Sequence, residues 1–331
     1  MKQKKDQKGL YFFSDIGHDQ FFRKVSGSEK FEKPTLSGPF YAYISEYKDH
    51  LPYFLELCWD CLLFRKSKDG KLIGYFELYM LQLKQTQGEV KGKKMSGLCI
   101  SNKNYRHEFF SEDESLVTSF FEHMKKFCLL VKFRLDFETI KVISQGINSK
   151  LFHIRKEKTS EEFAVKVFDK KSLENDLLQY SLVRNEILMM RLVDSEYVIR
   201  LHELYEGENY LYAVMEYIRG KRLFDYIREA RIFSERHALY VIKQVLLGLK
   251  HLHDRGLIHR DIKLENIMFR SSEKQAKVAL IDLGFCVRET ACMALTPQCG
   301  TPGYTALEIL RLEKYNRKVD VYSAGIVFYM M

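Results

Sequence analysis

Hydrophobic positions in the first part of the chain form short runs separated by turn signals, which is the pattern of β-strands. Residues 1–36 are polar and charged, show no regular period and are expected to form a polar tail. The apolar runs that follow are residues 40–44, 53–57, 62–64, 73–78, 98–100 and 105–110. Lys68-Asp69-Gly70 lies between two of these runs and predicts a hairpin turn. We therefore expect an antiparallel sheet from residue 37 onward.

A change of period marks a helix at the end of this strand-rich region. Ser111 and Glu114 have the spacing of a capping box. The apolar stripe that follows at helical spacing consists of Val117, Phe120, Phe121, Met124 and Phe127. Antiparallel strands closed by one amphipathic helix resemble a pleckstrin-homology (PH) domain, a β-barrel or sandwich with a C-terminal helix, over residues 37–130. The helix tryptophan typical of that family is absent, because the single Trp, Trp59, lies between strands.

The second part of the chain has a different pattern. Residues 137–168 again have the pattern of strands, and helical spacing dominates over residues 176–192, 223–230 and 234–255. A small β-rich unit followed by a helical unit predicts an α+β fold of two lobes over residues 137–331. Because the connection near residues 127–137 is short, we expect the two domains of this multidomain chain to be closely coupled.

Composition narrows the functional classes. With 46% hydrophobic and 29% charged residues, the 331-residue chain is expected to be globular. No apolar run approaches the roughly 18 residues of a membrane span, and the N-terminus lacks the pattern of a secretory signal. We expect a cytoplasmic protein, with the nucleus or the membrane periphery as alternatives. Cys58 and Cys61 form the only CxxC pair, without the second pair that zinc needs, so reduced thiols are expected.

The net charge of +9 favours acidic partners such as nucleotides, anionic lipids or nucleic acids. The densest basic stretches, residues 2–8 and 91–94, are not interleaved with aromatic residues as in a single-strand binder. Both are more typical of a solvated surface, and no nucleic-acid partner is expected.

Several short motifs fit phosphoryl transfer, which needs a cation on the phosphates, metal ligands and a base for the acceptor hydroxyl. Residues 164–167 read Ala-Val-Lys-Val in a strand-like run, and Glu186 follows in a helical run. Alone, such a lysine or glutamate is usually a solvated surface residue. Residues 259–266 read His-Arg-Asp-Ile-Lys-Leu-Glu-Asn, and residues 282–284 read Asp-Leu-Gly. Chance agreement at so many fixed positions is negligible.

These motifs resemble the V-A-I-K, H-R-D-x-K-x-x-N and D-F-G elements of the protein kinase family. Residues 300–308 resemble the end of the activation segment, and residues 320–325 resemble the start of helix F. Lys263 and the string at 299–304 are similar to those of serine/threonine rather than tyrosine kinases. Residues 223–227 resemble the calmodulin-dependent kinase group.

The resemblance implies a role for each matching residue. Asp261 would accept or orient the acceptor hydroxyl, and Lys263 would neutralise the γ-phosphate. Lys166 would hold the α- and β-phosphates while pairing with Glu186. Asp320 would hold the backbone of the catalytic loop.

The resemblance also implies ATP and a divalent metal. Asn266 and Asp282 would bind Mg²⁺ or Mn²⁺, because hard oxygen ligands suit these ions. The residues expected to bind the nucleotide are Gly146, Leu151, Ala164, Lys166, Glu216, Ile218, Met268, Asn266 and Asp282.

The sequence departs from the family pattern in three places. Ser144, Gly146 and Ser149 occupy the positions of the glycine loop, which predicts weaker ATP binding. Arg222 stands where many relatives of this group carry Glu, so a substrate arginine should be disfavoured. The chain ends six residues after Gly325, inside helix F, which predicts an incomplete C-terminal lobe and either a fragment or a truncated gene product.

The expected function is transfer of the ATP γ-phosphate to Ser/Thr of protein substrates, regulated by the PH-like domain. The alternative is a non-catalytic pseudokinase-type scaffold or an inactive kinase fragment. In the activation segment, Thr301 is expected near Asp261, and Thr296 is the expected phosphorylation site. The PH-like domain is expected to contact the kinase lobe or a protein partner.

Phosphoinositide binding is expected to be weak or absent. His50 and Pro52 stand where lipid-binding PH domains carry a basic pair, and Glu46 and Asp49 add negative charge. Each basic residue near an anionic membrane is worth about 1 kcal/mol.

Overall fold

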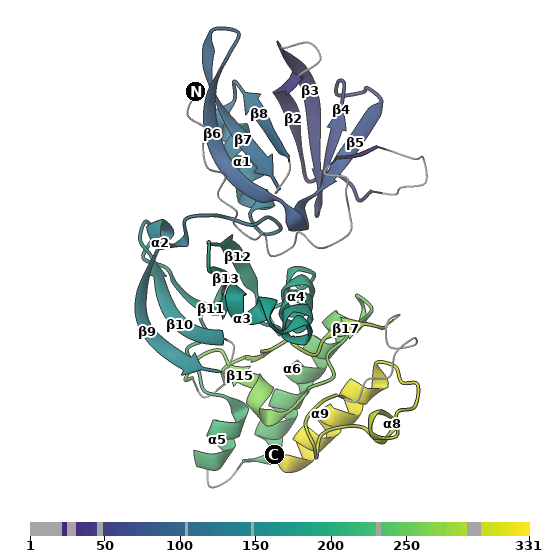
Figure 1. Cartoon of the computed structure of the whole chain (residues 1–331). Coiled ribbons are helices and arrows are strands. Elements are labelled where there is room, and N and C mark those ends of the chain that lie inside the picture. The colour runs from purple at the N-terminus through teal and green to yellow at the C-terminus, as the bar shows by residue number, and fades with distance from the viewer. Residues whose placement is uncertain are drawn as a thin grey trace.

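The computed structural model describes residues 22–24, 31–44, 49–102, 105–146, 149–229, 233–273, 275–289 and 299–331. A sheet-rich N-terminal domain (described residues up to 124) lies at one end of the molecule (Figure 1). A connecting segment (residues 125–136) leads from it into a two-lobed domain (residues 137–331), where a β-rich lobe lies between the N-terminal domain and a helical lobe (Figure 1).

The N-terminal domain is one antiparallel sheet of eight strands in the order β1-β5-β4-β3-β2-β8-β7-β6, followed by helix α1 (Glu114–Met124). Its strands are β1 (Arg23–Lys24), β2 (Leu36–Ile44), β3 (Asp49–Cys58), β4 (Cys61–Arg65), β5 (Leu72–Glu77), β6 (Gln82–Val90), β7 (Lys93–Ser101) and β8 (Arg106–Ser111). Phe22, in the stretch expected to be a polar tail, packs against Phe64 and Phe76.

The predicted apolar runs fall in six of these strands, and the pattern missed the two-residue β1 and the longer β6. Most side chains of β6 are polar, and it lies at an edge of the sheet. Lys91 and Gly92 connect β6 to β7 with φ angles of 51° and 76°. Two positive φ angles are those of the tight turns that suit the twist of a hairpin. At the predicted turn, the Gly70 N–H donates to Ser67 O at 3.0 Å.

The cap predicted for α1 was wrong. Asp113 caps the helix, because its side chain accepts from the Leu116 N–H at 3.1 Å. Ser111 instead ends β8, where its hydroxyl donates to Pro39 O at 3.2 Å. Three members of the predicted stripe are buried in the helix: Val117, Phe120 and Met124. Phe121 is half-buried, and Phe127 lies beyond the end of the helix.

The connecting segment pairs with both domains. Leu129 forms a parallel bridge with Gln82, and Leu130 forms one with Tyr205. Short helix α2 (Phe133–Asp136) follows. One hydrophobic core joins the N-terminal sheet and α1 to the β-rich lobe, with Phe120 and Val214 as members from either side.

The β-rich lobe is a five-stranded sheet in the order β12-β13-β11-β10-β9. Its elements are β9 (Phe137–Gln145), β10 (Ser149–Lys156), β11 (Glu162–Asp169), α3 (Lys170–Glu174), α4 (Leu177–Arg191), β12 (Leu201–Glu206) and β13 (Tyr210–Glu216). Helix α4 begins where Asp176 accepts from the Gln179 N–H at 3.0 Å, and it is the long helix of this lobe.

The helical lobe contains α5 and α6, whose bounds the sequence predicted to within two residues. Its elements are α5 (Leu223–Glu229), α6 (Glu235–His253), β14 (Leu257–Ile258), η2 (Leu264–Asn266), β15 (Ile267–Phe269), β16 (Val278–Leu280), β17 (Val287–Arg288), α8 (Leu307–Leu310) and α9 (Lys318–Met330). Strands β14 and β15 pair with β17 and β16. No helix in the described part of the chain is long and apolar enough to cross a membrane.

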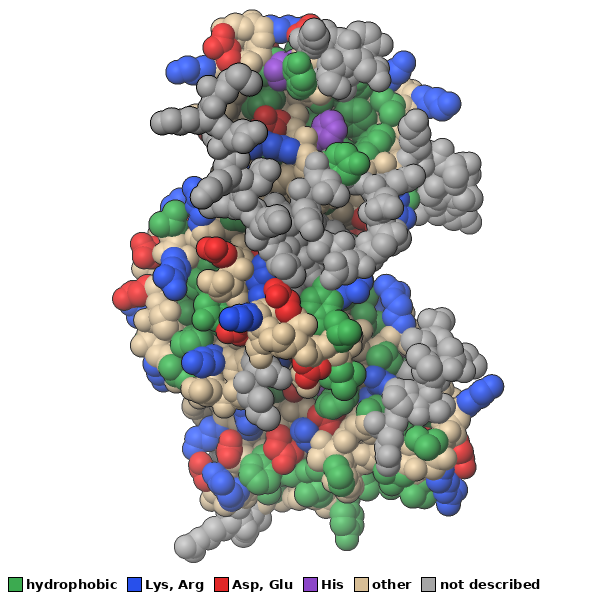
Figure 2. All heavy atoms as spheres, in the orientation of Figure 1, with side chains coloured by type: hydrophobic (Ala, Val, Ile, Leu, Met, Phe, Trp, Pro, Cys, Tyr) green, Lys and Arg blue, Asp and Glu red, His purple; other side chains and the backbone are tan. Residues whose placement is uncertain are grey.

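Acidic and basic side chains are intermixed over the face of the two-lobed domain shown in Figure 2. On this face the positive net charge of the chain is not gathered into one patch.

Candidate active site

A cleft of about 630 Å³ lies between the β-rich and helical lobes. Its walls include every residue that the sequence assigned to nucleotide binding, from Gly146 on β9's end to Asp282 behind β16. Residues that the sequence did not single out also line it: Met190, Ile199 and Ile281. Apolar side chains of this kind carry no chemical signature, so only the fold reveals them as cleft residues.

The apolar part of the cleft is built from strand positions on both lobes. Leu151 on β10 and Ala164 on β11 lie on the roof, and Met268 on β15 lies on the floor. Ile218 follows β13 where the chain passes between the lobes. Such a layered apolar slot fits a flat heteroaromatic ring.

Lys166 and Glu186 form an ion pair inside the cleft. Lys166 Nζ lies 2.7 Å and 2.9 Å from the two carboxylate oxygens of Glu186. Burial opposes the charge of Lys166, but the carboxylates of Glu186 and Asp282 outweigh it and raise the pKa of this ammonium. A charged lysine is thus fixed by α4 at the place where phosphate would enter.

Asp261 is the centre of a polar cluster on the other lobe. Lys263 Nζ lies 2.8 Å from Asp261 Oδ2, and the Thr301 hydroxyl donates to Asp261 Oδ1 at 2.6 Å. Lys263 also donates to the Thr301 oxygen at 2.8 Å. Asn266 Nδ2 donates to both Asp261 O and Oδ2, at 2.9 Å and 2.8 Å. A buried carboxylate that already accepts a hydrogen bond from a hydroxyl has the geometry of a base for the hydroxyl of a substrate.

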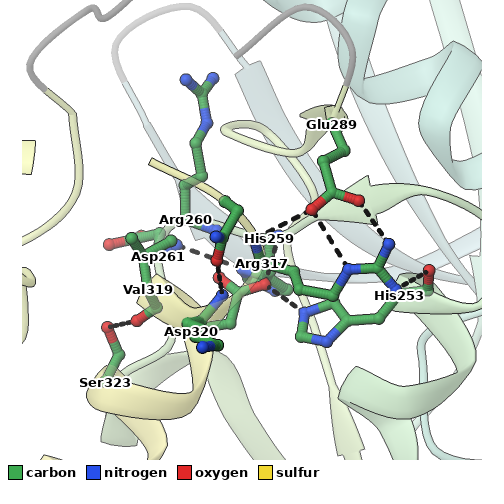
Figure 3. Close-up of polar contacts among 11 residues, drawn as sticks. His253, His259, Arg260, Asp261, Glu289, Arg317, Val319, Asp320 and Ser323 are labelled. Atoms are coloured by element: carbon green, nitrogen blue, oxygen red, sulfur yellow. Dashed lines mark hydrogen bonds and ion pairs between the residues drawn. The ribbon is translucent and has the colours of Figure 1, made fainter. Parts of the chain in front are cut away.

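Asp320, fully buried on α9, fixes the backbone that carries Asp261 (Figure 3). It accepts the N–H groups of His259 and Arg260 at 2.9 Å and 2.8 Å, and His253 Nε2 lies 2.8 Å away. Arg260 has a φ of 66°, in the left-handed region that costs a non-glycine residue about 1–2 kcal/mol. Burial lowers the pKa of His259, and its Nδ1 accepts the Asp261 N–H at 3.3 Å.

The oxygen donors at the cleft fit a magnesium or manganese ion. Both hydrogen bonds of the Asn266 side chain use Nδ2, so neither commits its side-chain oxygen. Asp282 has a φ of 78° and uses Oδ1 to accept from the Gly284 N–H at 2.9 Å. Among the described residues no group of three or more His, Cys, Asp or Glu side chains is placed to hold a metal. An ion here would need phosphate oxygens to complete its shell.

One residue near the cleft was missed by sequence reasoning, and one residue that the sequence singled out lies outside the described residues. Arg270 pairs with the carboxylate of Glu216, which also accepts the Arg200 N–H at 2.9 Å. No motif includes Arg270, so the side chain that steadies Glu216 carried no sequence signal. Thr296 lies outside the described residues.

The fold and this cleft are those of a protein kinase. Residues 137–331 match the family described as protein kinase domain, which is more than half of the chain. The chain therefore belongs to the protein kinase family.

Curated relatives agree with this family. The chain is 35% identical over 176 residues to calcium/calmodulin-dependent protein kinase type 1 of Macrobrachium nipponense, covering 53% of this chain and 50% of that protein. It is 31% identical over 238 residues to probable serine/threonine-protein kinase 2 of Plasmodium falciparum, covering 70% and 45%. It is 34% identical over 191 residues to the type 1 kinase of Caenorhabditis elegans, covering 57% and 54%. The chain thus spans about half the length of these relatives.

Proposed function

We propose that this chain transfers the γ-phosphate of ATP to serine or threonine hydroxyls of protein substrates. The observation that carries the proposal is the simultaneous presence, around one cleft, of the Lys166–Glu186 pair and the Asp261 cluster. The serine/threonine specificity rests on Lys263 beside Asp261 and on the names of the relatives.

Each residue would act through its position. Lys166 would hold the α- and β-phosphates, and Asp261 would orient the acceptor hydroxyl and take its proton. Lys263, at 2.8 Å from Asp261, would balance charge on the transferred group. Asn266 and Asp282 would hold the divalent ion, which neutralises phosphate charge when bound.

A pseudokinase-type scaffold is the second candidate, and the glycine loop favours it. Ser144 and Ser149 stand at two of the three loop positions, and only Gly146 remains. The Gly146 N–H already donates to Ser149 O at 2.9 Å. A side chain at Gly146 would meet only ordinary contacts, so the space at this position does not require a glycine.

A phosphotransfer assay with Mg·ATP on the full chain distinguishes the two candidates. The wild type should label itself or a general protein substrate, while Lys166→Met and Asp282→Ala should abolish the signal. Nucleotide binding is measured in parallel by calorimetry. Nucleotide binding without transfer in the wild type would contradict the catalytic proposal and support the scaffold.

Substrate choice is proposed to depend on Arg222, which lines the cleft near Glu265. A cation there should repel an arginine that precedes the acceptor residue. Arg222→Glu should raise preference for such peptides by about 1 kcal/mol, as expected for a partly exposed charge pair. A peptide array is the measurement, and a wild-type profile dominated by that arginine would refute the idea.

Activation is proposed to depend on phosphorylation of Thr296. Arg260, next to Asp261 in the sequence, is the cation proposed to receive the phosphate. Its Nε donates to Phe285 O at 2.8 Å and its Nη1 to the Tyr315 hydroxyl at 2.9 Å. A phosphate would offer stronger, charge-assisted acceptors. Full activity in Thr296→Ala, with phosphate mapped elsewhere, would exclude this site.

The N-terminal domain is proposed to be a PH-type domain that binds phosphoinositides weakly or not at all. Its antiparallel sheet followed by α1 supports the first part. His50 packs its ring against Tyr43 and Phe110, with centroids 5.4 Å and 5.7 Å away, and Pro52 lies in β3. Glu46 lies outside the described residues. Sedimentation of the full chain with phosphoinositide liposomes should show no headgroup-selective binding, and micromolar selective binding would overturn the assignment.

A further inference from the structure

Arg191, the last residue of α4, is fully buried although it belongs to the residue types that are rarely buried. We propose that Arg191 is a positioning residue through which the N-terminal domain holds α4, and with it Glu186, in place for Lys166. The inference rests on the proposed kinase activity for its catalytic readout. Its structural readout does not depend on that activity.

The Arg191 guanidinium reaches out of its own domain. Nη1 donates to Tyr79 O at 2.8 Å, and Nη2 lies 3.3 Å from Cys128 O. Tyr79 belongs to the N-terminal domain, in the turn η1 (Leu78–Met80), and Cys128 belongs to the connecting segment. One side chain of the β-rich lobe therefore joins two other parts of the molecule.

Both acceptor carbonyls lie in segments that are held by buried residues and hydrogen bonds. Leu78, which starts η1, is fully buried, and its N–H donates to Asp60 O at 2.9 Å. Cys128 is also fully buried. The two segments are tied to each other, because the Leu129 N–H donates to Leu81 O at 2.8 Å. These contacts oppose displacement of the two carbonyls, so the hydrogen bonds from Arg191 hold the end of α4 against them.

The same helix carries the residues that reach the cleft. Glu186 is five positions before Arg191, which places the two about 140° apart around the helix axis and about 7.5 Å apart along it. Glu186 thus faces the cleft while Arg191 faces the N-terminal domain. Asn185 Nδ2 donates to Cys286 O at 2.6 Å, which joins α4 to the chain just beyond Asp282. A shift of the Arg191 end would displace both contacts.

The guanidinium depends on these carbonyls. Burial lowers the pKa of Arg191 to about 10, which leaves it charged at neutral pH. A buried cation needs acceptors for its donors, and charge-assisted bonds to fixed carbonyls hold it strongly. Lysine lacks the planar fork that serves two acceptors at once.

The test uses kinetics of the full chain. Arg191→Met should lower kcat by about tenfold, within the roughly 5–150-fold range of typical site coupling, with a smaller change in KM for peptide. Arg191→Lys should fall between Met and wild type. Lys126→Met is the matched control, because Lys126 pairs with Asp194 at 3.3 Å and lies over Trp59 at the same interface without belonging to α4. It should leave kcat within about twofold.

A double-variant cycle separates positioning from general damage. If Arg191 acts through Glu186, then Arg191→Met should change kcat by less than about twofold in a Glu186→Gln background. An undiminished tenfold loss in that background would overturn the proposal, and so would wild-type kcat in Arg191→Met.

Hydrogen exchange followed by mass spectrometry supplies the readout that does not need catalysis. Amides of residues 177–191 should exchange about tenfold faster in Arg191→Met, while those of α6 stay unchanged. If the wild type transfers no phosphate but exchange in α4 rises selectively in Arg191→Met, the kinase proposal fails and the proposal that Arg191 holds α4 stands. Unchanged exchange in α4 would show that Arg191 does not hold this helix, whatever the activity.

Discussion

The catalytic loop (residues 259–266) and helix α4 are each held by one fully buried charged side chain. The two side chains differ in which parts of the molecule they join. Asp320 accepts backbone N–H groups of the catalytic loop, whereas Arg191 donates to backbone carbonyls outside its own domain. One is an anion that serves N–H donors and the other is a cation that serves C=O acceptors. Both are less than 1% exposed.

The two sets of hydrogen bonds therefore respond to different movements of the molecule. Asp320 and the loop it holds both belong to the helical lobe, so the position of Asp261 is set within that lobe. The position of Glu186 depends on a bond between domains. Anything that separates the N-terminal domain from the β-rich lobe should therefore change the Lys166–Glu186 pair before it changes Asp261.

The largest expected effect is on the base itself. Asp261→Asn keeps the shape of the cluster but removes the proton acceptor, so turnover should fall by roughly two to four decades. Mg·ATP binding should change little, because Asp261 is not among the residues that line the nucleotide cleft. Steady-state phosphotransfer and calorimetric ATP titration are the measurements. Unchanged turnover would show that Asp261 is not the base.

The second-largest effect is expected at Asp320, which holds the catalytic loop from within the same lobe. Asp320→Leu leaves the N–H groups of His259 and Arg260 without their acceptor, and each buried orphan costs about 1–3 kcal/mol. We expect a loss of about 3 kcal/mol in the free energy of unfolding, measured with urea.

Arg317→Met is the neighbouring control for that measurement. Arg317 pairs with Glu289 on the surface beside Asp320 (Figure 3), and such exposed pairs contribute about 0–1 kcal/mol. Equal losses in Asp320→Leu and Arg317→Met would show that Asp320 does not brace the loop.

The two braces also differ in how far the sequence could predict them. Asp320 lies in a recognisable string of residues, and its role followed from the resemblance before the structure placed it against the loop. Arg191 ends a helical run in which an arginine normally reaches solvent. Only the packing of η1 and Cys128 around it shows otherwise, and these contacts are 112 and 63 residues away in sequence.

The same reasoning explains the other differences. Local strings placed the cleft residues, and helical periodicity placed α4 and α6, since both signals reside in neighbouring residues. Strand β6 was missed because an edge strand needs few apolar positions, and the α1 cap was misplaced because Asp113 competes with Ser111. Contacts between distant polar side chains leave no local pattern.

The smallest expected effect concerns a contact between the β-rich lobe and the connecting segment that leads to the N-terminal domain. Glu203 on β12 is buried and lies 3.0 Å from Lys125, just after α1, and 2.8 Å from Lys156. Burial raises its pKa, but the two ammonium groups outweigh burial and hold the pKa of Glu203 below the usual 4.5. A depressed pKa means that the charged form is favoured by folding. The stabilisation is therefore complete above pH 4.5 and is lost as the pH falls through the folded-state pKa.

Glu203→Gln should consequently lower the free energy of unfolding by about 1 kcal/mol at pH 7, and the difference from wild type should shrink as the pH falls below 4.5. Urea unfolding at several pH values measures it, with Glu138→Gln as the control because Glu138 is an exposed residue 4.0 Å from Arg155. If this contact only supports the domain interface, kcat at pH 7 should stay within about twofold of wild type, unlike in Arg191→Met. A tenfold fall in kcat with Glu203→Gln would mean that the whole interface, and not the Arg191 bond, positions α4. A destabilisation that is the same at pH 7 and pH 4 would mean that the charge of Glu203 does not hold the domains together.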